Sequence, residues 1–124
     1  MTKRLLVVDD EETILFAIDR YFSRMGFTVD CARELEEAEA LATCTTYDLV
    51  IADLSLTESG STEGLEIIRY VRRNCPTARV ILLTAHGSPM AEKEAFRRGA
   101  DVFLHKPSPL AEIARIATGL MEGT

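Results

Sequence analysis

The sequence predicts an α/β fold in which five parallel strands form one sheet between two layers of helices. Two observations predict it. Short apolar runs alternate with amphipathic segments along the whole chain, and four of the five runs are continuous stretches rich in Val, Ile and Leu. Such runs are typical of strands that are buried on both faces of a parallel sheet. Five strand and helix units joined by right-handed crossovers give a (βα)5 sandwich of three layers.

One of the five expected strands differs from the others. Residues 27–31 read FTVDC, in which Phe27, Val29 and Cys31 alternate with polar residues. We therefore expect this strand at an edge of the sheet, with one face toward water. The other four strands are expected at LLVV 5–8, LVIA 49–52, VILLT 80–84 and VFL 102–104.

Helical stripes of apolar residues fill the gaps between the strands. The first stripe ends at Gly26, the expected C-terminal cap, and the third stops before Pro76. The segment MAEKEAFRR, between Pro89 and Gly99, is helical in pattern but has few apolar residues, so we expect it to be held loosely. The other four stripes are Ile14, Ile18, Phe22 and Met25; Leu35, Ala38 and Leu41; Leu65, Ile68 and Val71; and Leu110, Ile113, Ala117 and Leu120.

Length, charge and cysteine content limit the classes of function. The 124 residues suit one domain, expected over 1–124. A net charge of -6 argues against nucleic acid or an anionic membrane as a direct partner. No apolar run is long enough for a transmembrane helix, and residues 1–4 lead directly into a strand, so no signal peptide is expected. Three cysteines without CxxC spacing indicate reduced thiols in a cytoplasmic protein.

Polar side chains follow the apolar runs, at the edge where parallel sheets form their sites. Asp9 and Asp10 follow the first run and Asp53 follows the third. Thr84 ends the fourth, and Lys106 comes shortly after the fifth. Each has an ordinary explanation when taken alone: an N-cap or solvated aspartate, a strand threonine, a surface lysine. Their shared placement at one edge favours a common site.

The chemistry of this set indicates phosphoryl transfer. Three carboxylates suit Mg²⁺, a hard cation that binds few protein carboxylates and keeps several waters. The charges of Mg²⁺ and Lys106 would together balance the three carboxylates. A phosphoryl group brings a charge of about -2, and the hydroxyl of Thr84 and the ammonium of Lys106 can bind its oxygens. The residues therefore predict metal-assisted phosphoryl transfer to a carboxylate.

Four segments carry a family resemblance: LLVVDDEE, DLVIADLSL, VILLTA and VFLHKP. They resemble the signature segments of response-regulator receiver domains of two-component signalling, in the chemotaxis-regulator-like superfamily, and the resemblance covers essentially the whole chain. It implies a flavodoxin-like sheet of strand order 2-1-3-4-5. It also implies that a sensor histidine kinase or phosphotransfer protein donates the phosphoryl group and that a downstream effector domain or protein reads the result.

The resemblance assigns the acceptor and the metal ligands. Asp53 resembles the phosphoacceptor. Asp9 and Asp10 resemble the acidic pair that binds Mg²⁺, with Asp10 as the direct ligand and Asp9 acting largely through water. Asp53 and the backbone carbonyl of Ser55 would complete the metal site.

The resemblance also assigns the response to phosphorylation. Thr84 resembles the switch hydroxyl and Lys106 the lysine that contacts the phosphoryl group, so both join Asp53 in the transfer. Lys106 and Pro107 match the family's usual cis peptide. Phe103 falls at the aromatic switch position. A homodimer through the face formed by residues 90–98, the last strand and the final helix is a further expectation.

The sequence departs from the family pattern in two places, and His86 is a further position of note. The stretch DLSLTESGSTEGLE has Thr57 where the family usually has proline, and it reaches its glycine, Gly64, later. Phe103 lacks the hydroxyl that many members have at this position. His86 lies two residues beyond Thr84, where side chains can influence dephosphorylation, although an exposed loop histidine explains it equally well. The loop at 54–64 and His86 therefore bear on the lifetime of the phosphorylated state.

Two other functions stay open. DLSLT loosely resembles the nucleophile motif of haloacid-dehalogenase-like phosphatases, but those enzymes have a second acid where this chain has Ser55, and their acidic pair comes late. We expect no enzyme activity beyond the chain's own phosphorylation and dephosphorylation. The second alternative is a degenerate receiver that acts as a constitutive interaction module, although all five site residues are present.

Overall fold

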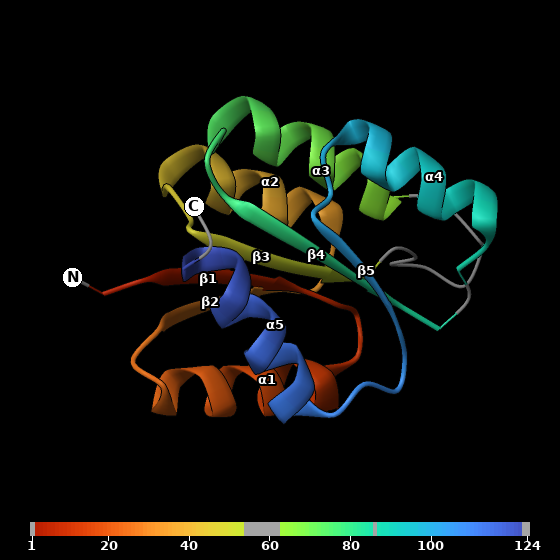
Figure 1. The fold of residues 1–124 in the computed structure, drawn as a ribbon. Helices are drawn as coiled ribbons and strands as arrows, with labels where there is room; N and C mark the ends of the chain where they lie inside the picture. The colour runs from red at the N-terminus through yellow and green to blue at the C-terminus, as the bar shows by residue number, and fades with distance from the viewer. Residues whose placement is uncertain (1, 54–62, 86, 123–124) are drawn as a thin grey trace.

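The computed structural model describes residues 2–53, 63–85 and 87–122. Strands and helices alternate through it, and a parallel five-stranded sheet lies between two helical layers (Figure 1). The strand order is β2-β1-β3-β4-β5, as the resemblance implies. The elements are β1 Arg4–Val8, α1 Glu12–Arg24, β2 Thr28–Ala32, α2 Leu35–Cys44, β3 Leu49–Asp53, α3 Glu63–Asn74, β4 Arg79–Thr84, α4 Pro89–Arg98, β5 Val102–His105 and α5 Leu110–Glu122.

The core has two halves, one on each face of the sheet. Helices α2, α3 and α4 cover one face, and α1 and α5 cover the other (Figure 1). Because successive side chains of a strand point to opposite faces, Leu6 and Val8 of β1 belong to the first half and Leu5 and Val7 to the second. Continuous apolar strands are therefore needed at the centre of the sheet, as the sequence predicts.

The edge position expected for β2 is confirmed, and the stripe expected for the first helix is partly wrong. Met25 lies just beyond the end of α1, and 44% of its surface is exposed. Leu15 is buried in its place, together with Ile18 and Phe22. Gly26 follows the capping residue with a left-handed φ of 99°, so α1 ends one residue earlier than expected.

Helix α4 is held by few apolar side chains, as its sequence predicts. Ala95 is its one fully buried residue, and 83% of Met90 is exposed. The helix begins at Pro89, and the Ser88 hydroxyl caps it by accepting the N–H of Ala91 at 3.1 Å. It ends at Arg98 and is capped by Gly99, which has a left-handed φ of 115°.

A buried tyrosine joins β2 to the segment before β3. The Tyr47 hydroxyl donates to Asp30 Oδ2 at 2.7 Å, and burial together with this carboxylate raises the pKa of Tyr47. The Tyr47 N–H donates to the sulfur of Cys75, one of three free cysteines.

Across the described ranges, every helix falls short of the length and apolar character that a membrane crossing needs.

Candidate functional site

Four predicted side chains meet at the carboxyl ends of the strands. Asp9 directly follows β1, and Asp53 and Thr84 are the last residues of β3 and β4. Lys106 directly follows β5, at the edge strand beside β4. The parallel register places the strand ends side by side, and the Asp9 N–H continues the ladder by donating to Ala32 O at 3.0 Å. The fold therefore brings these residues together as the sequence predicts.

Asp9 is a buried carboxylate with two partners. It is only 2% exposed; Oδ1 accepts the N–H of Glu11 at 2.9 Å, and Oδ2 accepts Lys106 Nζ at 2.9 Å. Burial raises the pKa of the Asp9 carboxyl, and the hydrogen bonds from Lys106 and Glu11 counteract this only in part. The bond to Glu11, the residue before α1, means that Asp9 also supports the start of that helix.

Lys106 is an interior lysine and not an ordinary surface residue. Its side chain is 11% exposed, and Nζ lies 2.9 Å from Asp9 Oδ2 and 3.2 Å from Asp53 Oδ2. Burial alone would lower the pKa of this ammonium, but the hydrogen bonds and charges of Asp9 and Asp53 raise it. The Lys106 N–H donates to Thr84 O at 2.8 Å, and the Lys106–Pro107 peptide is cis, as the resemblance implies.

The acidic residues fit a divalent cation. Asp9, Asp10 and Asp53 each offer one oxygen, and these oxygens all lie within 4.8 Å of one another. Asp9 and Asp53 are buried while Asp10 is exposed, so a cation at this place would have protein ligands on one side and water on the other. Three hard oxygen donors with access to water are the set that Mg²⁺ or Ca²⁺ prefers. Ser55 and His86 lie outside the described residues.

The two expected switch residues lie against a glycine that sequence reasoning missed. Thr84 and Phe103 are both buried. A Cβ added at Gly87 would lie 2.7 Å from the Phe103 ring and 2.9 Å from Thr84 Cγ2, so both side chains fit only against a bare backbone. The Phe103 ring also packs edge-on against His105, with centroids 5.6 Å apart. The one sequence feature that could have indicated this contact is the glycine itself, three residues beyond Thr84.

Glu11 is a second residue that sequence reasoning left without a role. Its Oε1 lies 3.7 Å from Lys106 Nζ, although its side chain is largely exposed. It borders a pocket of about 520 Å³ between the starts of α1 and α5. Ile14, Leu110 and Ile113 supply apolar walls of this pocket, and Lys106 lies at its boundary with the acidic site.

Comparisons with known proteins agree with this geometry. The family model described as the response regulator receiver domain matches residues 5–118. ResD, a transcriptional regulatory protein of Bacillus subtilis, is 33% identical over 114 residues, which cover 91% of this chain and 46% of ResD. The response regulator PilR of Pseudomonas aeruginosa is 31% identical over 119 residues, 95% of this chain and 26% of PilR. The chain thus spans less than half the length of these two relatives.

Solved structures show the same fold. A response regulator from Burkholderia pseudomallei, with a phosphorylated aspartic acid, a calcium ion and citrate, has a TM-score of 0.85 at 30% identity, covering 98% of this chain and 70% of that one. The beryllofluoride-activated NtrC4 receiver domain dimer has a TM-score of 0.87 at 30% identity, covering 98% of each chain. A CheY-like receiver domain protein from Methanospirillum hungatei shares the fold, with a TM-score of 0.92 at 23% identity over 99% of this chain and 96% of that one. On its sequence match, its strand order and its neighbours, the chain belongs to the receiver domain family of two-component response regulators.

Proposed function

We propose that this receiver domain is switched by phosphorylation of Asp53, with Mg²⁺ held by Asp9, Asp10 and Asp53. One observation carries the proposal. The Asp53 carboxylate ends the central strand β3, is 6% exposed, and lies 3.2 Å from the Lys106 ammonium and within 4.8 Å of two further carboxylates. A buried carboxylate so close to other carboxylates is costly unless cations balance it.

The phosphoryl group comes from the phosphohistidine of a sensor histidine kinase or phosphotransfer protein. An Asp53 oxygen attacks phosphorus, a P–O bond forms, and the P–N bond breaks with its electron pair going to the leaving imidazole. Lys106, hydrogen-bonded to Asp53 Oδ2, orients the carboxylate and binds the arriving oxygens. Mg²⁺ would neutralise charge on the phosphoryl group during transfer. The apolar pocket beside Lys106 offers the donor a place to dock.

The response begins at Thr84 and reaches a partner through α4. The Thr84 hydroxyl binds a new phosphoryl oxygen. The movement of Thr84 displaces two neighbours, Gly87, which precedes α4, and Phe103, which lies in β5. The exposed side chains of Met90 and Phe96 suit the recognition of an effector domain or a second copy through the face of α4, β5 and α5. The NtrC4 receiver dimer supports the second copy. The free cysteines favour a cytoplasmic location.

Phosphorylation with acetyl phosphate and Mg²⁺ tests the acceptor. Wild type should gain one hydroxylamine-labile phosphoryl group, and Asp53→Asn should gain none. Asp48→Asn is the matched control, because Asp48 directly precedes β3, at the end opposite Asp53, and its carboxylate accepts the Arg4 N–H at 2.9 Å. Undiminished labelling of Asp53→Asn would contradict the assignment.

Two further measurements, phosphomonoester turnover and stabilisation by Mg²⁺, separate the two alternative functions from the proposed one. A haloacid-dehalogenase-like phosphatase would turn over a phosphomonoester such as p-nitrophenyl phosphate many times per protein molecule, whereas the proposed receiver would not. A degenerate receiver would take up no phosphoryl group and would gain no stability from Mg²⁺.

A further inference from the structure

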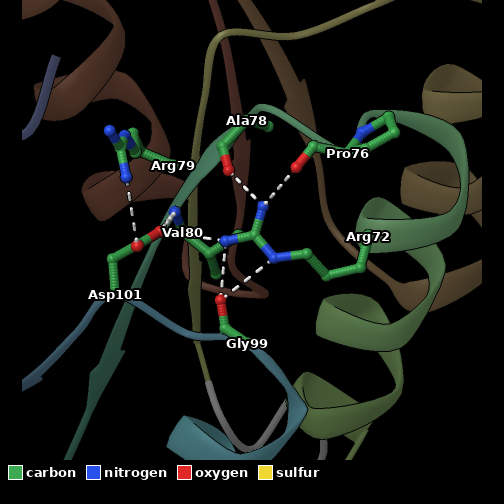
Figure 2. A network of polar contacts seen from close by, with 7 residues as sticks. All are labelled: Arg72, Pro76, Ala78, Arg79, Val80, Gly99 and Asp101. Atoms are coloured by element: carbon green, nitrogen blue, oxygen red, sulfur yellow. Dashed lines mark hydrogen bonds and ion pairs between the residues drawn. The ribbon is translucent and has the colours of Figure 1, made fainter. Parts of the chain in front are cut away.

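Arg72 of α3 binds the turn between α4 and β5 and the loop that leads into β4 (Figure 2). Its Nε and Nη2 donate to Gly99 O at 3.1 and 2.6 Å, and Nη2 donates to Asp101 Oδ2 at 3.0 Å. Its Nη1 donates to Pro76 O at 3.2 Å and to Ala78 O. One guanidinium therefore fixes three backbone carbonyls and a carboxylate, a pattern that needs the planar fork of arginine.

Asp101 and Gly99 complete this contact. Asp101 Oδ2 also accepts the Val80 N–H at 2.8 Å, and Oδ1 lies 3.6 Å from Arg79 Nη1. Gly99 has a left-handed φ, and a Cβ at this position would lie 2.7 Å from Arg72 Nε, so only glycine fits. The C-terminal end of α4 is thus bound to both α3 and β4.

The other end of α4 is held quite differently. Over residues 89–93 of the described chain, no side chain forms a hydrogen bond or ion pair with another element. Ala91 packs against the core from this part of the helix and Ala95 from the next turn, and both side chains are single methyl groups. Arg98, in contrast, lies next to Gly99 and pairs with Glu66 of α3 at 3.2 Å. The polar contacts between α4 and its neighbours are therefore concentrated at its C-terminal end.

We infer that Arg72 is the fixed point about which α4 turns when Asp53 is phosphorylated. The inference rests on the proposed function. The free end of α4 follows Gly87, which packs on Thr84 and Phe103. A displacement there moves the N-terminal half of the helix, while Arg72 keeps residues 99–101 on α3 and β4. Arg72 acts as a positioning residue: it touches no reacting atom, and it confines the change to 87–96.

Amide hydrogen exchange with and without beryllofluoride and Mg²⁺ tests this role. The measured quantity is the ratio of exchange rates in the two states, because this ratio cancels a general loss of stability. In wild type we expect this ratio to differ from one over residues 87–96 and to stay near one at the amides of Ala100 and Asp101. In Arg72→Met the change should extend to these two amides, by about tenfold, since charge-assisted hydrogen bonds are lost there.

Three further variants make the test specific. Arg73→Met is the matched control, because Arg73 is the exposed next residue of the same helix, and it should behave as wild type. Arg72→Lys keeps the charge but not the fork, so it should resemble Arg72→Met; recovery of the wild-type pattern would show that charge alone is needed and would overturn the inference. Asp101→Asn keeps an acceptor for the Val80 N–H and weakens the contacts of this side chain with Arg72 and, at the longer distance of 3.6 Å, with Arg79. It should show the same spread, at smaller size, even if Arg72→Met does not fold.

Two results distinguish failure of this inference from failure of the proposed function. A wild-type change as large at residues 99–101 as at 87–96 would overturn the role of Arg72 and leave the phosphorylation of Asp53 standing. If beryllofluoride changes exchange nowhere and acetyl phosphate labels no residue, the proposed function itself is wrong.

Discussion

Replacement of Lys106 by methionine tests whether this lysine serves to balance buried charge. Methionine keeps an apolar stem of similar shape but leaves Asp9 and Asp53 without the ammonium that lies 2.9 and 3.2 Å from them. Removal of one partner from a buried ion pair costs about 3–5 kcal/mol, and we expect about 3 because the exposed Asp10 admits water to one side of the site. With an unfolding entropy of about 2.1 cal/mol/K per residue, this loss lowers Tm by about 12 °C.

The loss should depend on divalent cations and on pH. Mg²⁺ bound by the carboxylates replaces the missing positive charge and should restore most of the lost stability. Acid should have a similar effect. Because burial holds the pKa of Asp9 above its ordinary 3.8, the stability linked to this group is fully present below 3.8 and is lost as pH rises through the higher folded value. Without Lys106 that folded pKa rises further, so the difference between variant and wild type should shrink as pH falls from 7 toward 4.

Thermal unfolding followed by circular dichroism measures these effects in EDTA and in Mg²⁺, at pH 7 and pH 4.5. Lys93→Met is the control, since Lys93 is exposed on α4 and pairs with no acidic side chain among the described residues. A Lys106→Met variant that loses as much stability in Mg²⁺ as in EDTA, and as much at pH 4.5 as at pH 7, would refute the charge-balance argument. The loss would then have to come from packing of the lysine stem.

Three further predictions concern the metal, the switch residue Thr84 and the glycine that packs on Thr84 and Phe103. Mg²⁺ at 100 times its Kd should stabilise wild type by about 2.7 kcal/mol, or about 10 °C in Tm. Mg²⁺ should stabilise Asp10→Ala much less. Without metal this variant should be at least as stable as wild type, because one of three like charges is gone. Equal stabilisation of the two proteins by Mg²⁺ would exclude Asp10 from the metal site. Thr84→Ala should still be phosphorylated on Asp53 but lose most of the exchange change over 87–96; changes confined to 54–64 would make that loop the output element instead. Gly87→Ala should displace the Phe103 ring and cost about 1–3 kcal/mol, seen as a lower Tm and shifted ring resonances; an unchanged ring environment would contradict the contact.

The strands were more predictable than the helix surfaces. Burial on both faces imposes continuous apolar runs, so the strand expected at 49–52 is found at Leu49–Asp53. A helix can rotate about its axis and still present an apolar stripe to the core, and in the first helix several sets of positions would form such a stripe. This is why the pattern singled out Met25, which is exposed, and passed over Leu15, which is buried.

The site was predictable where it depends on strand ends. A parallel sheet collects the residue after each strand at one edge, so Asp9, Asp53 and Lys106 could be grouped from their places in the sequence. The contacts of Arg72 could not be found this way. Its partners include the backbone carbonyls of two loops, and a carbonyl carries no side-chain identity that a sequence could show.

Tyr47 gives the domain a natural optical signal for unfolding. The chain has no tryptophan, and the Tyr47 phenol lies at the end of β3 opposite Asp53, bonded to Asp30. Because burial and Asp30 raise the pKa of Tyr47 in the folded protein, the stability linked to this group is fully present below the unfolded value of 10.0 and is lost as pH rises above it. The chain also has Tyr21 and Tyr70, so the Tyr47 signal is the difference between the ultraviolet absorbance of wild type and that of Tyr47→Phe. This tyrosinate signal should appear together with alkaline denaturation, so a residue of the chain itself can report its unfolding.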